Sequence, residues 1–308
     1  MNKKVVCIGA VLVDELFFCK EAVIAGTSNP ANSSKSAGGV MRNIAHHLVL
    51  LDVDTAFITV AGNDSDGTWL LDECKAAGID VSSALIANCQ TGKYVAILQP
   101  NGSLFTAATV NPCDDYLNIA LLEENKSKLL AATIIVADTN LSTEVLAWLI
   151  AFCFEHRLML CLEPVSVVKA KKLSELDLKG VYLITPNEDE LTLLNTETLN
   201  TEGSIKKLME RGVEKTWVRR GANGSVMYSK GKSLEIAAPV VTVKDSTGAG
   251  DAALAGYIAA YCLGMDERAC IEAGHAMAAM IIQIRGAVDA GINKQKFLSA
   301  LTHYYPHG

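Results

Sequence analysis

The residues with the clearest chemical potential lie in a loop that leads into a helix near the end of the 308-residue chain. An apolar run at 240–243 predicts a strand, small residues follow it, and an apolar helical stretch begins near Asp251. Gly248 and Gly250 allow a tight turn and let a ligand approach the backbone. Free N–H groups at a helix start, with the helix dipole, favour a negative group there. The pattern predicts a site for a phosphoryl group in transfer.

Asp251 follows this loop directly and is expected in the first turn of the helix. We expect its carboxylate to stay ionised, because the field at a helix N-terminus stabilises the charged form. A weak base is adequate, since phosphoryl transfer is largely dissociative and the acceptor hydroxyl loses its proton late. Asp251 is therefore predicted to orient the acceptor hydroxyl and take its proton. The alternative is an Asp that only stabilises its helix; the preceding Thr247–Gly250 segment favours the catalytic role.

Two rival phosphate motifs are not present in the sequence. A Walker A loop ending at Gly231-Lys232-Ser233 would need glycine at position 226, which is valine. The first predicted strand is followed by Gly9 alone, without the glycine pattern of a dinucleotide site. A redox enzyme of the Rossmann type is therefore a distant alternative.

Composition narrows the remaining classes. The net charge is −7 and no Lys/Arg run is dense, so we expect no nucleic-acid partner. Nine scattered cysteines without a C-x-x-C pair are typical of reduced thiols, which favours a cytoplasmic location. Residues 5–13 are interpreted as a first strand rather than a signal peptide, because Asp14 and Glu15 follow. No stretch reaches the ~18 apolar residues of a spanning helix, so no membrane association is expected.

Short apolar runs alternate with amphipathic stretches along most of the chain. Strands are predicted at 5–8, 56–60, 134–137, 159–162, 181–184, 216–218 and 240–243. Helices are predicted at 43–51, 67–77, 117–130, 142–156, 188–194, 201–211, 250–263, 266–284 and 293–303. This order predicts one α/β domain over residues 1–308, with a mostly parallel sheet covered on both faces.

Two segments break the alternation. Residues 15–37 lack a helical period, and residues 90–110 contain alternating runs on either side of Pro100-Asn101-Gly102, a hairpin signal. We expect these two segments to pair into a small accessory sheet that acts as a lid. Its exposed edges would be a liability, so the lid is also predicted to join two subunits in a homodimer.

Taken together, these motifs resemble the ribokinase family of PfkB-type carbohydrate kinases over nearly the whole chain. Residues 245–251 match the C-terminal signature, residues 38–43 and 61–67 the N-terminal signature, and residues 187–190 the N-x-x-E motif. The resemblance implies a ribokinase-like three-layer α/β sandwich with a lid. It also implies ATP and Mg²⁺ as cofactors and a small sugar or nucleoside as substrate.

The resemblance also implies roles for individual residues. Gly248, Ala249 and Gly250 would form an anion hole beside the base Asp251. Asp14, Gly39 and Asn43 match positions that hold sugar hydroxyls. Asn187 and Glu190 would organise Mg²⁺ and phosphates, partly through water; a capping box between them is the alternative.

Further positions match the nucleotide side of the family's site. Gly221 and Gly224 match a nucleotide-contacting turn, and His275 lies where a residue near adenine is common, although packing explains it equally well. Arg219 departs from the pattern, which usually has a small hydroxyl residue; it either reaches a phosphate or narrows the ATP site. The positions that resemble a monovalent-cation site, for example for K⁺, are Asp245, Thr247 and Arg285-Gly286.

Two stretches resemble the pseudouridine kinase branch: Ser28-Asn29-Pro30, and Glu163–Lys169 directly after a strand. Carboxyl ends of parallel strands are where ligands bind in such sheets, so Lys169 is a candidate substrate contact. The alternative is a simple strand-to-helix turn with Ser166 as N-cap. The expected reaction is phosphorylation of the 5′-hydroxyl of a nucleoside, with pseudouridine as the expected acceptor. A kinase for ribose, a hexose or a purine nucleoside, and a non-catalytic sugar or nucleoside sensor, are the alternatives.

Overall fold

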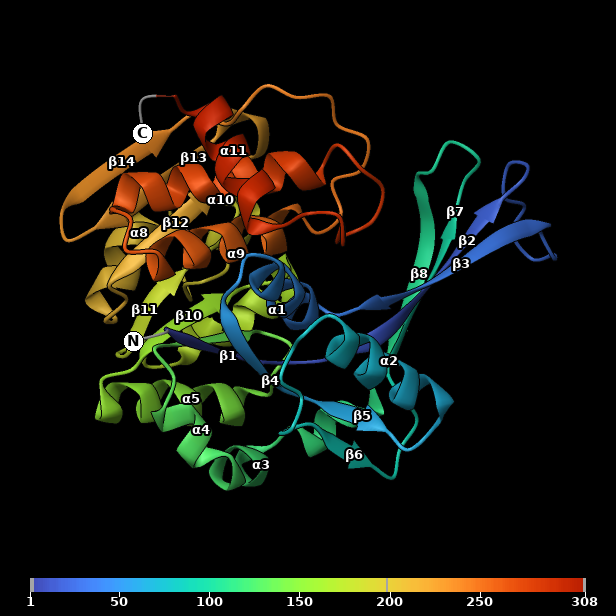
Figure 1. Cartoon of the computed structure of the whole chain (residues 1–308), viewed down its shortest axis with the longest axis horizontal. Coiled ribbons are helices and arrows are strands. Elements are labelled where there is room, and N and C mark those ends of the chain that lie inside the picture. Colours follow the sequence, from blue (N-terminus) through green and yellow to red (C-terminus); the bar gives the residue numbers. More distant parts are fainter. Residues whose placement is uncertain (1–2, 198, 307–308) are drawn as a thin grey trace.

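The computed structural model describes residues 3–197 and 199–306, which form a large sheet between two helical layers (Figure 1). The large sheet has eight strands in the order β14-β13-β12-β11-β10-β9-β1-β4. The strands are β1 (Lys4–Ile8), β4 (Asp54–Ile58), β9 (Ile134–Asp138), β10 (Met159–Glu163), β11 (Val181–Ile184), β12 (Lys215–Arg219), β13 (Ser225–Ser229) and β14 (Lys232–Ile236). All neighbours are parallel except those of β13, which is antiparallel to β12 and to β14. The predicted mostly parallel sheet is confirmed.

Both faces of this sheet are buried under helices. Successive side chains of a strand point to opposite sides, so they enter two different cores. Val5 and Cys7 pack into one core, and Val6 and Ile8 into the other. The first core contains α1 (Val40–Leu50), α2 (Ser65–Ala76), α9 (Ala249–Cys262), α10 (Glu267–Ile281) and α11 (Lys294–Tyr304). The second contains α3 (Ile119–Glu124), α4 (Lys126–Leu130), α5 (Thr143–His156), α6 (Val167–Ala170), α7 (Glu188–Leu191) and α8 (Thr201–Glu210).

A second sheet projects from the body (Figure 1). It consists of β2 (Leu12–Cys19), β3 (Ala31–Gly38), β7 (Lys93–Leu98) and β8 (Leu104–Val110), in the order β3-β2-β7-β8. The parallel pairing of β2 with β7 joins the two segments that sequence reasoning singled out. We call these four strands the small sheet. Beside it, β5 (Val60–Gly62) pairs with β6 (Leu85–Ala87).

Two predicted elements differ from the structure, and one hairpin was not predicted. Residues 240–243 are not a strand, since they run past the end of α10, where Lys244 N–H donates to Ile282 O at 2.8 Å, and Val240 is fully exposed. The predicted helix 117–130 is broken at Asn125, whose side chain donates to the Leu121 carbonyl at 2.9 Å. The hairpin β13–β14 was missed, although its Lys230-Gly231 turn has positive φ at both residues, as a tight hairpin requires.

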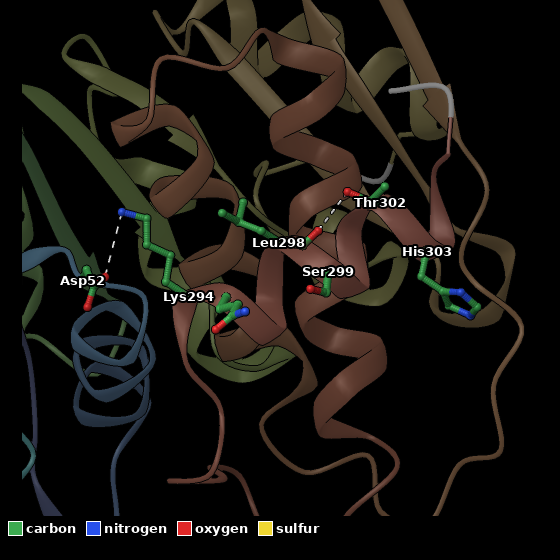
Figure 2. A pocket seen from close by; sticks show the side chains of 7 residues that line it. Asp52, Lys294, Leu298, Ser299, Thr302 and His303 are labelled. Atoms are coloured by element: carbon green, nitrogen blue, oxygen red, sulfur yellow. Dashed lines mark hydrogen bonds and ion pairs between the residues drawn. The ribbon is translucent and has the colours of Figure 1, made fainter.

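The C-terminal helix α11 leaves a groove beside the end of α1 (Figure 2). It is lined by Asp52, Lys294, Gln295, Leu298, Ser299, Thr302 and His303. A charge pair across it joins Lys294 to Asp52, with Nζ 3.9 Å from Oδ2. Within the described residues, no helix is both long and apolar enough to cross a membrane.

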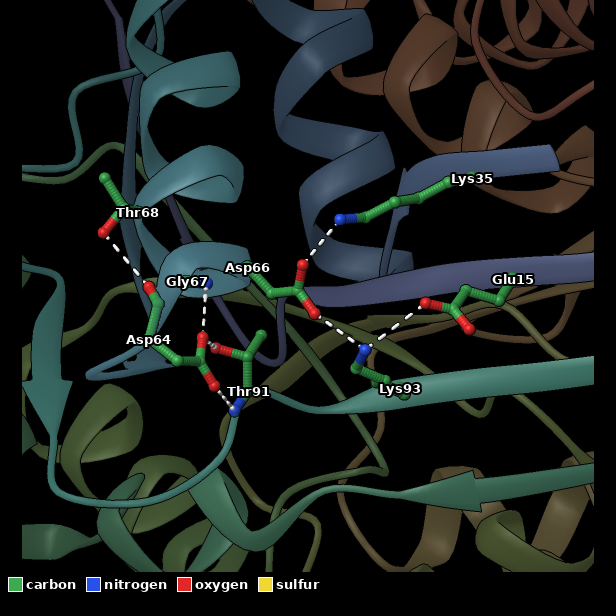
Figure 3. A network of polar contacts seen from close by, with 8 residues as sticks. All are labelled: Glu15, Lys35, Asp64, Asp66, Gly67, Thr68, Thr91 and Lys93. Atoms are coloured by element: carbon green, nitrogen blue, oxygen red, sulfur yellow. Dashed lines mark hydrogen bonds and ion pairs between the residues drawn. The ribbon is translucent and has the colours of Figure 1, made fainter.

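A polar network fixes the small sheet to the body (Figure 3). Asp66, in the first turn of α2, pairs with Lys35 of β3 at 2.5 Å and with Lys93 of β7 at 2.7 Å. Asp64 caps α2 through the Gly67 N–H at 2.8 Å and also accepts the N–H and the hydroxyl of Thr91, just ahead of β7. One carboxylate thus fixes both a helix end and the start of a strand.

The Asp64 contacts predict an unequal cost for two N-cap substitutions. Asp64→Ala is expected to lower the free energy of unfolding by about 2–4 kcal/mol, because a cap and two hydrogen bonds to a carboxylate are lost together. Asp266→Ala removes only the cap of α10, where the carboxylate accepts the Ala269 N–H, and should cost about 1 kcal/mol. Urea unfolding of both variants measures the difference, and equal losses would contradict the linking role of Asp64.

Candidate active site

The loop at 247–250 meets α9 at the carboxyl edge of the large sheet. Gly248 is the N-cap of α9, with φ of 74°, and a side chain there would collide with Ala287. The N–H groups of Gly248, Gly250 and Asp251 have no acceptor among the described residues, whereas Ala249 N–H donates to Ser246 O at 3.2 Å. The predicted anion hole is therefore open at two glycines and at Asp251, and its middle N–H is engaged.

Asp251 is nearly buried, with 9% of its surface exposed, in the first turn of α9. Its Oδ2 accepts a hydrogen bond of 2.8 Å from Nδ2 of Asn43 in α1. Burial raises the pKa of Asp251 to about 7; the Asn43 bond and the charge of Arg219 lower it, and Glu163 and Asp138 raise it. The expectation of a fully ionised carboxylate is thus wrong for neutral pH, because desolvation outweighs the helix field.

Three of the four residues predicted to hold the substrate lie on β2 or at the start of α1. Gly39 is the N-cap of α1 with φ of 105°, and a Cβ there would lie 2.4 Å from the Ala10 carbonyl. Asp14, on β2 of the small sheet, has its pKa raised by burial to about 6, although the charge of Arg42 lowers it. Arg42 acts electrostatically on Asp14 and Asp251 alike. Asn43 Oδ1 is buried without a partner among the described residues and is free to bind a hydroxyl.

Two buried carboxylates that were not predicted as site residues end neighbouring strands here. Asp138 ends β9 and Glu163 ends β10, paired in register. Asp138 is fully buried; its Oδ1 accepts the Asn140 N–H at 2.8 Å, and within the described ranges Oδ2 has no partner. Burial raises the pKa of Asp138 to about 6. The available signal was an acidic residue directly after each buried apolar run.

Arg219 ends β12 and brings positive charge to this edge. Its Nη2 donates to Glu163 Oε1 at 2.6 Å and lies 3.8 Å from Glu190 Oε2. The guanidinium also lies against the head of α9, since a Cβ at Gly250 would be 2.4 Å from Nη1. The structure therefore places Arg219 beside the predicted phosphate loop.

Asn187 and Glu190 form the capping box that was the alternative to a metal role. Asn187 Oδ1 accepts the Glu190 N–H at 2.8 Å, and Glu190 Oε2 accepts the Asn187 N–H at 2.9 Å. Burial raises the pKa of Glu190, which is 4% exposed. The cap accounts for one oxygen of each side chain, so a role in organising Mg²⁺ stays a prediction.

The remaining nucleotide-side residues lie in two places. Gly221 and Gly224 begin and follow a turn after β12, both with positive φ. His275 is buried between Trp217 and Tyr305, and its ring nitrogens contact the Ser225 hydroxyl at 2.8 Å and the Tyr305 hydroxyl at 3.0 Å. Both nitrogens are thus occupied by protein groups, which supports packing as its role.

The predicted cation residues come together around one carboxylate. Asp245 accepts the Thr247 N–H at 2.9 Å through Oδ1 and the Gly286 N–H at 3.0 Å through Oδ2. Burial raises its pKa, and these hydrogen bonds outweigh that effect and hold it below its usual value. Among the described residues, no group of three or more Asp, Glu, His or Cys side chains is arranged to hold a metal ion.

Lys169 lies in α6, next to the carboxyl end of β9. Its Nζ donates to Asn140 Oδ1, and its charge lowers the pKa of Asp138. Ser166 is the N-cap of α6, but its side chain makes no capping hydrogen bond. The turn thus has the position expected of a cap without the cap's hydrogen bond, and a substrate contact at Lys169 stays a prediction.

The groove in Figure 2 is separate from this site, since its seven lining residues include none of the predicted ones. The site consists instead of the polar groups that lie around the N-terminus of α9. Unpaired N–H groups and one guanidinium lie beside a carboxylate with a pKa near neutrality. Such a set can bind a phosphoryl group and accept a proton from an attacking hydroxyl.

Comparisons with known proteins agree with this chemistry. The family model described as pfkB family carbohydrate kinase matches residues 2–294. Pseudouridine kinase from Escherichia coli is 28% identical over 271 residues, covering 85% of this chain and 84% of the relative. Guanosine-inosine kinase from Exiguobacterium acetylicum is 26% identical over 290 residues, covering 92% and 95%.

Solved structures share the fold. A carbohydrate kinase from Agrobacterium tumefaciens has a TM-score of 0.85 at 25% identity, covering 97% of each chain. Ribokinase from Arabidopsis thaliana, solved with ribose and ATP, has a TM-score of 0.84 at 21% identity, covering 98% of this chain and 99% of that chain. The chain therefore belongs to the pfkB family of carbohydrate kinases, which transfer a phosphoryl group to an alcohol.

Proposed function

We propose that this kinase phosphorylates the 5′-hydroxyl of a nucleoside, with pseudouridine as the preferred acceptor and ATP as the donor. The observation that carries the proposal is the 2.8 Å hydrogen bond from Asn43 to Asp251 at the head of α9. It sets a hydroxyl-binding amide beside a general base and beside unpaired N–H groups. The pseudouridine kinase relative supports the choice of acceptor.

In the proposed mechanism, Asp14, Gly39 and Asn43 bind the ribose hydroxyls, and Lys169 contacts the substrate beside Asp138. Asp251 orients the 5′-hydroxyl and accepts its proton as the oxygen attacks the γ-phosphorus. The N–H groups of Gly248, Gly250 and Asp251 hold the phosphoryl oxygens at the helix N-terminus. Gly221 and Gly224 contact the nucleotide, while His275 positions Trp217 and Tyr305.

We propose Mg²⁺ as a cofactor that ATP carries into the site. The buried carboxylates of Glu163 and Glu190 offer the oxygen donors that Mg²⁺ prefers. They are too few for a protein-only cage, which fits an ion held mainly by phosphates and water. Its charge would offset that of the phosphates. Asp245, Thr247 and Gly286 are the proposed residues of a monovalent-cation site.

A substrate panel tests the proposal. Coupled ADP detection with pseudouridine, uridine, guanosine and ribose should give the highest kcat/KM for pseudouridine. Asp251→Asn should cut kcat on the best acceptor at least ~100-fold, since a general base is lost, while its KM changes much less. The best acceptor being ribose or a hexose would reject the nucleoside assignment. Turnover of Asp251→Asn near that of the wild type would remove Asp251 from its role.

The pH dependence follows from the pKa of Asp251. The base acts when ionised, and its raised pKa of about 7 means that the ionised fraction falls as pH drops below 7. We expect kcat/KM to decline about tenfold per pH unit well below 7 and to level off above it. Asp14, with a pKa of about 6, is expected to steepen the lower part. A profile that stays flat from pH 8 to pH 5, on protein shown by circular dichroism to be folded, would contradict this.

We also propose that the small sheet pairs two subunits. Every residue of β8 is exposed, with Leu104, Phe105 and Val110 among them, and an exposed apolar edge strand invites pairing. Light scattering should give the mass of two 32.8-kDa chains. Phe105→Glu should halve that mass, and Phe154→Glu, a matched change at an exposed phenylalanine of α5, should not. A monomeric wild type would reject this interface.

A further inference from the structure

Arg219 is a largely buried cation that the mechanism above leaves without a role. Its side chain is 17% exposed and closes the end of β12. The ideal Cβ position of Gly250 lies 2.4 Å from Nη1, so the guanidinium lies directly against the first turn of α9. A cation here adds to the positive end of the helix dipole, whereas a helix start ordinarily favours acidic side chains.

One edge of this guanidinium is fixed. Nη2 donates to Glu163 Oε1 at 2.6 Å, and Glu190 Oε2 is 3.8 Å away. Glu163 is itself held, because its Oε2 accepts the Thr185 hydroxyl at 2.6 Å. Both carboxylates are 4% exposed. The charge is therefore positioned before any ligand binds, so little reorganisation is needed when charge develops nearby.

The other edge is free. Over residues 3–197 and 199–306, Nη1 has no hydrogen-bond acceptor, although a guanidinium has five N–H donors to satisfy. The N–H groups of Gly250 and Asp251 beside it are unpaired as well. Three neighbouring unpaired donors at a helix N-terminus, one of them charged, call for an anion rather than a neutral group.

We propose that Arg219 is a further catalytic residue, whose Nη1 contacts the γ-phosphoryl group of ATP during transfer. This rests on the proposed function. In the step itself, the acceptor oxygen bonds to phosphorus while the bond from phosphorus to the bridging oxygen breaks. The electron pair leaves with ADP, and the hydroxyl proton passes to Asp251. Negative charge spreads over the equatorial phosphoryl oxygens, and a fixed guanidinium stabilises it there.

The competing explanation is that Arg219 only neutralises Glu163 and Glu190. Both explanations predict some loss of stability when the charge is removed, because a buried carboxylate loses its partner. They differ in the reaction, since a purely structural arginine would not contribute more to the transition state than to bound nucleotide. The decisive measurement therefore compares transition-state and ground-state binding.

The test uses Arg219→Gln, with Arg220→Gln as the matched control. Arg220 is the next residue and pairs with Glu235 of β14. Arg219→Gln should lower kcat at least ~100-fold, the size of losing one transition-state donor, with the acceptor KM nearly unchanged. Arg220→Gln should stay within about twofold of wild type, as expected of an exposed ion pair.

Two readouts separate catalysis from folding. Arg219→Gln should weaken binding of ADP with aluminium fluoride and acceptor ~100-fold, but binding of ADP alone by no more than about twofold. Guanidinium ions at millimolar concentration should restore part of the turnover of Arg219→Ala and leave wild type unchanged. If Arg219→Gln does not fold, the double variant Arg219→Gln/Glu163→Gln removes both charges of the pair. It is compared with Glu163→Gln alone, and the same ~100-fold loss relative to that single variant is expected.

The outcomes distinguish this inference from the proposed function. The acceptor is whichever member of the panel wild type phosphorylates, so a wrong nucleoside assignment does not affect the test. Wild-type turnover that persists in Arg219→Gln, or equal weakening of ADP and of the fluoride complex, overturns the catalytic role alone. A wild type that phosphorylates no acceptor overturns both.

Discussion

The constraint on which this site depends is the burial of negative charge at one edge of a parallel sheet. Asp138, Glu163, Glu190 and Asp251 are each 9% exposed or less, and Arg219 is the cation that pairs with two of them. Burial alone would protonate such groups. The helix N-terminus, the Asn43 hydrogen bond and the guanidinium oppose that tendency, which leaves Asp251 with a pKa near 7. A base with a pKa near the working pH suits proton transfer.

Parallel topology explains why these groups meet. Because β9, β10 and β12 run in the same direction, their last residues lie along one edge, and ligands bind at that edge in open α/β sheets. Helix α9 follows a long excursion through β13 and β14, yet it packs against α1. The contact of Asn43 with Asp251, 208 residues apart, follows from that packing. The small sheet brings Asp14 to the same side, supported by the pairing of α2 with Lys35 and Lys93.

Some side chains of the site cap a helix and also have a proposed role in catalysis. Asn187 and Glu190 complete a capping box, and Glu190 also faces Arg219. A residue that stabilises its own helix end can therefore hold a charge at the active edge. Such dual use means that a local motif does not by itself separate a structural role from a functional one.

The sequence by itself determined the parallel sheet, the two segments of the small sheet, and the glycine turn that leads into α9 at Asp251, because these are local signals. Hydrophobic period, glycine placement and turn residues act over a few positions. They can be identified in the sequence without knowledge of the tertiary contacts. It failed at residues 240–243, where β-branched residues are exposed in an extended loop, since strand formation depends on a neighbour to pair with. Asp138 and the free edge of Arg219 were not predicted, and Glu163 was singled out only as the start of the stretch 163–169. Their burial, their partners and the pKa of Asp251 arise from strands and helices distant in sequence, and only tertiary packing sets the desolvation and the charges that each group experiences.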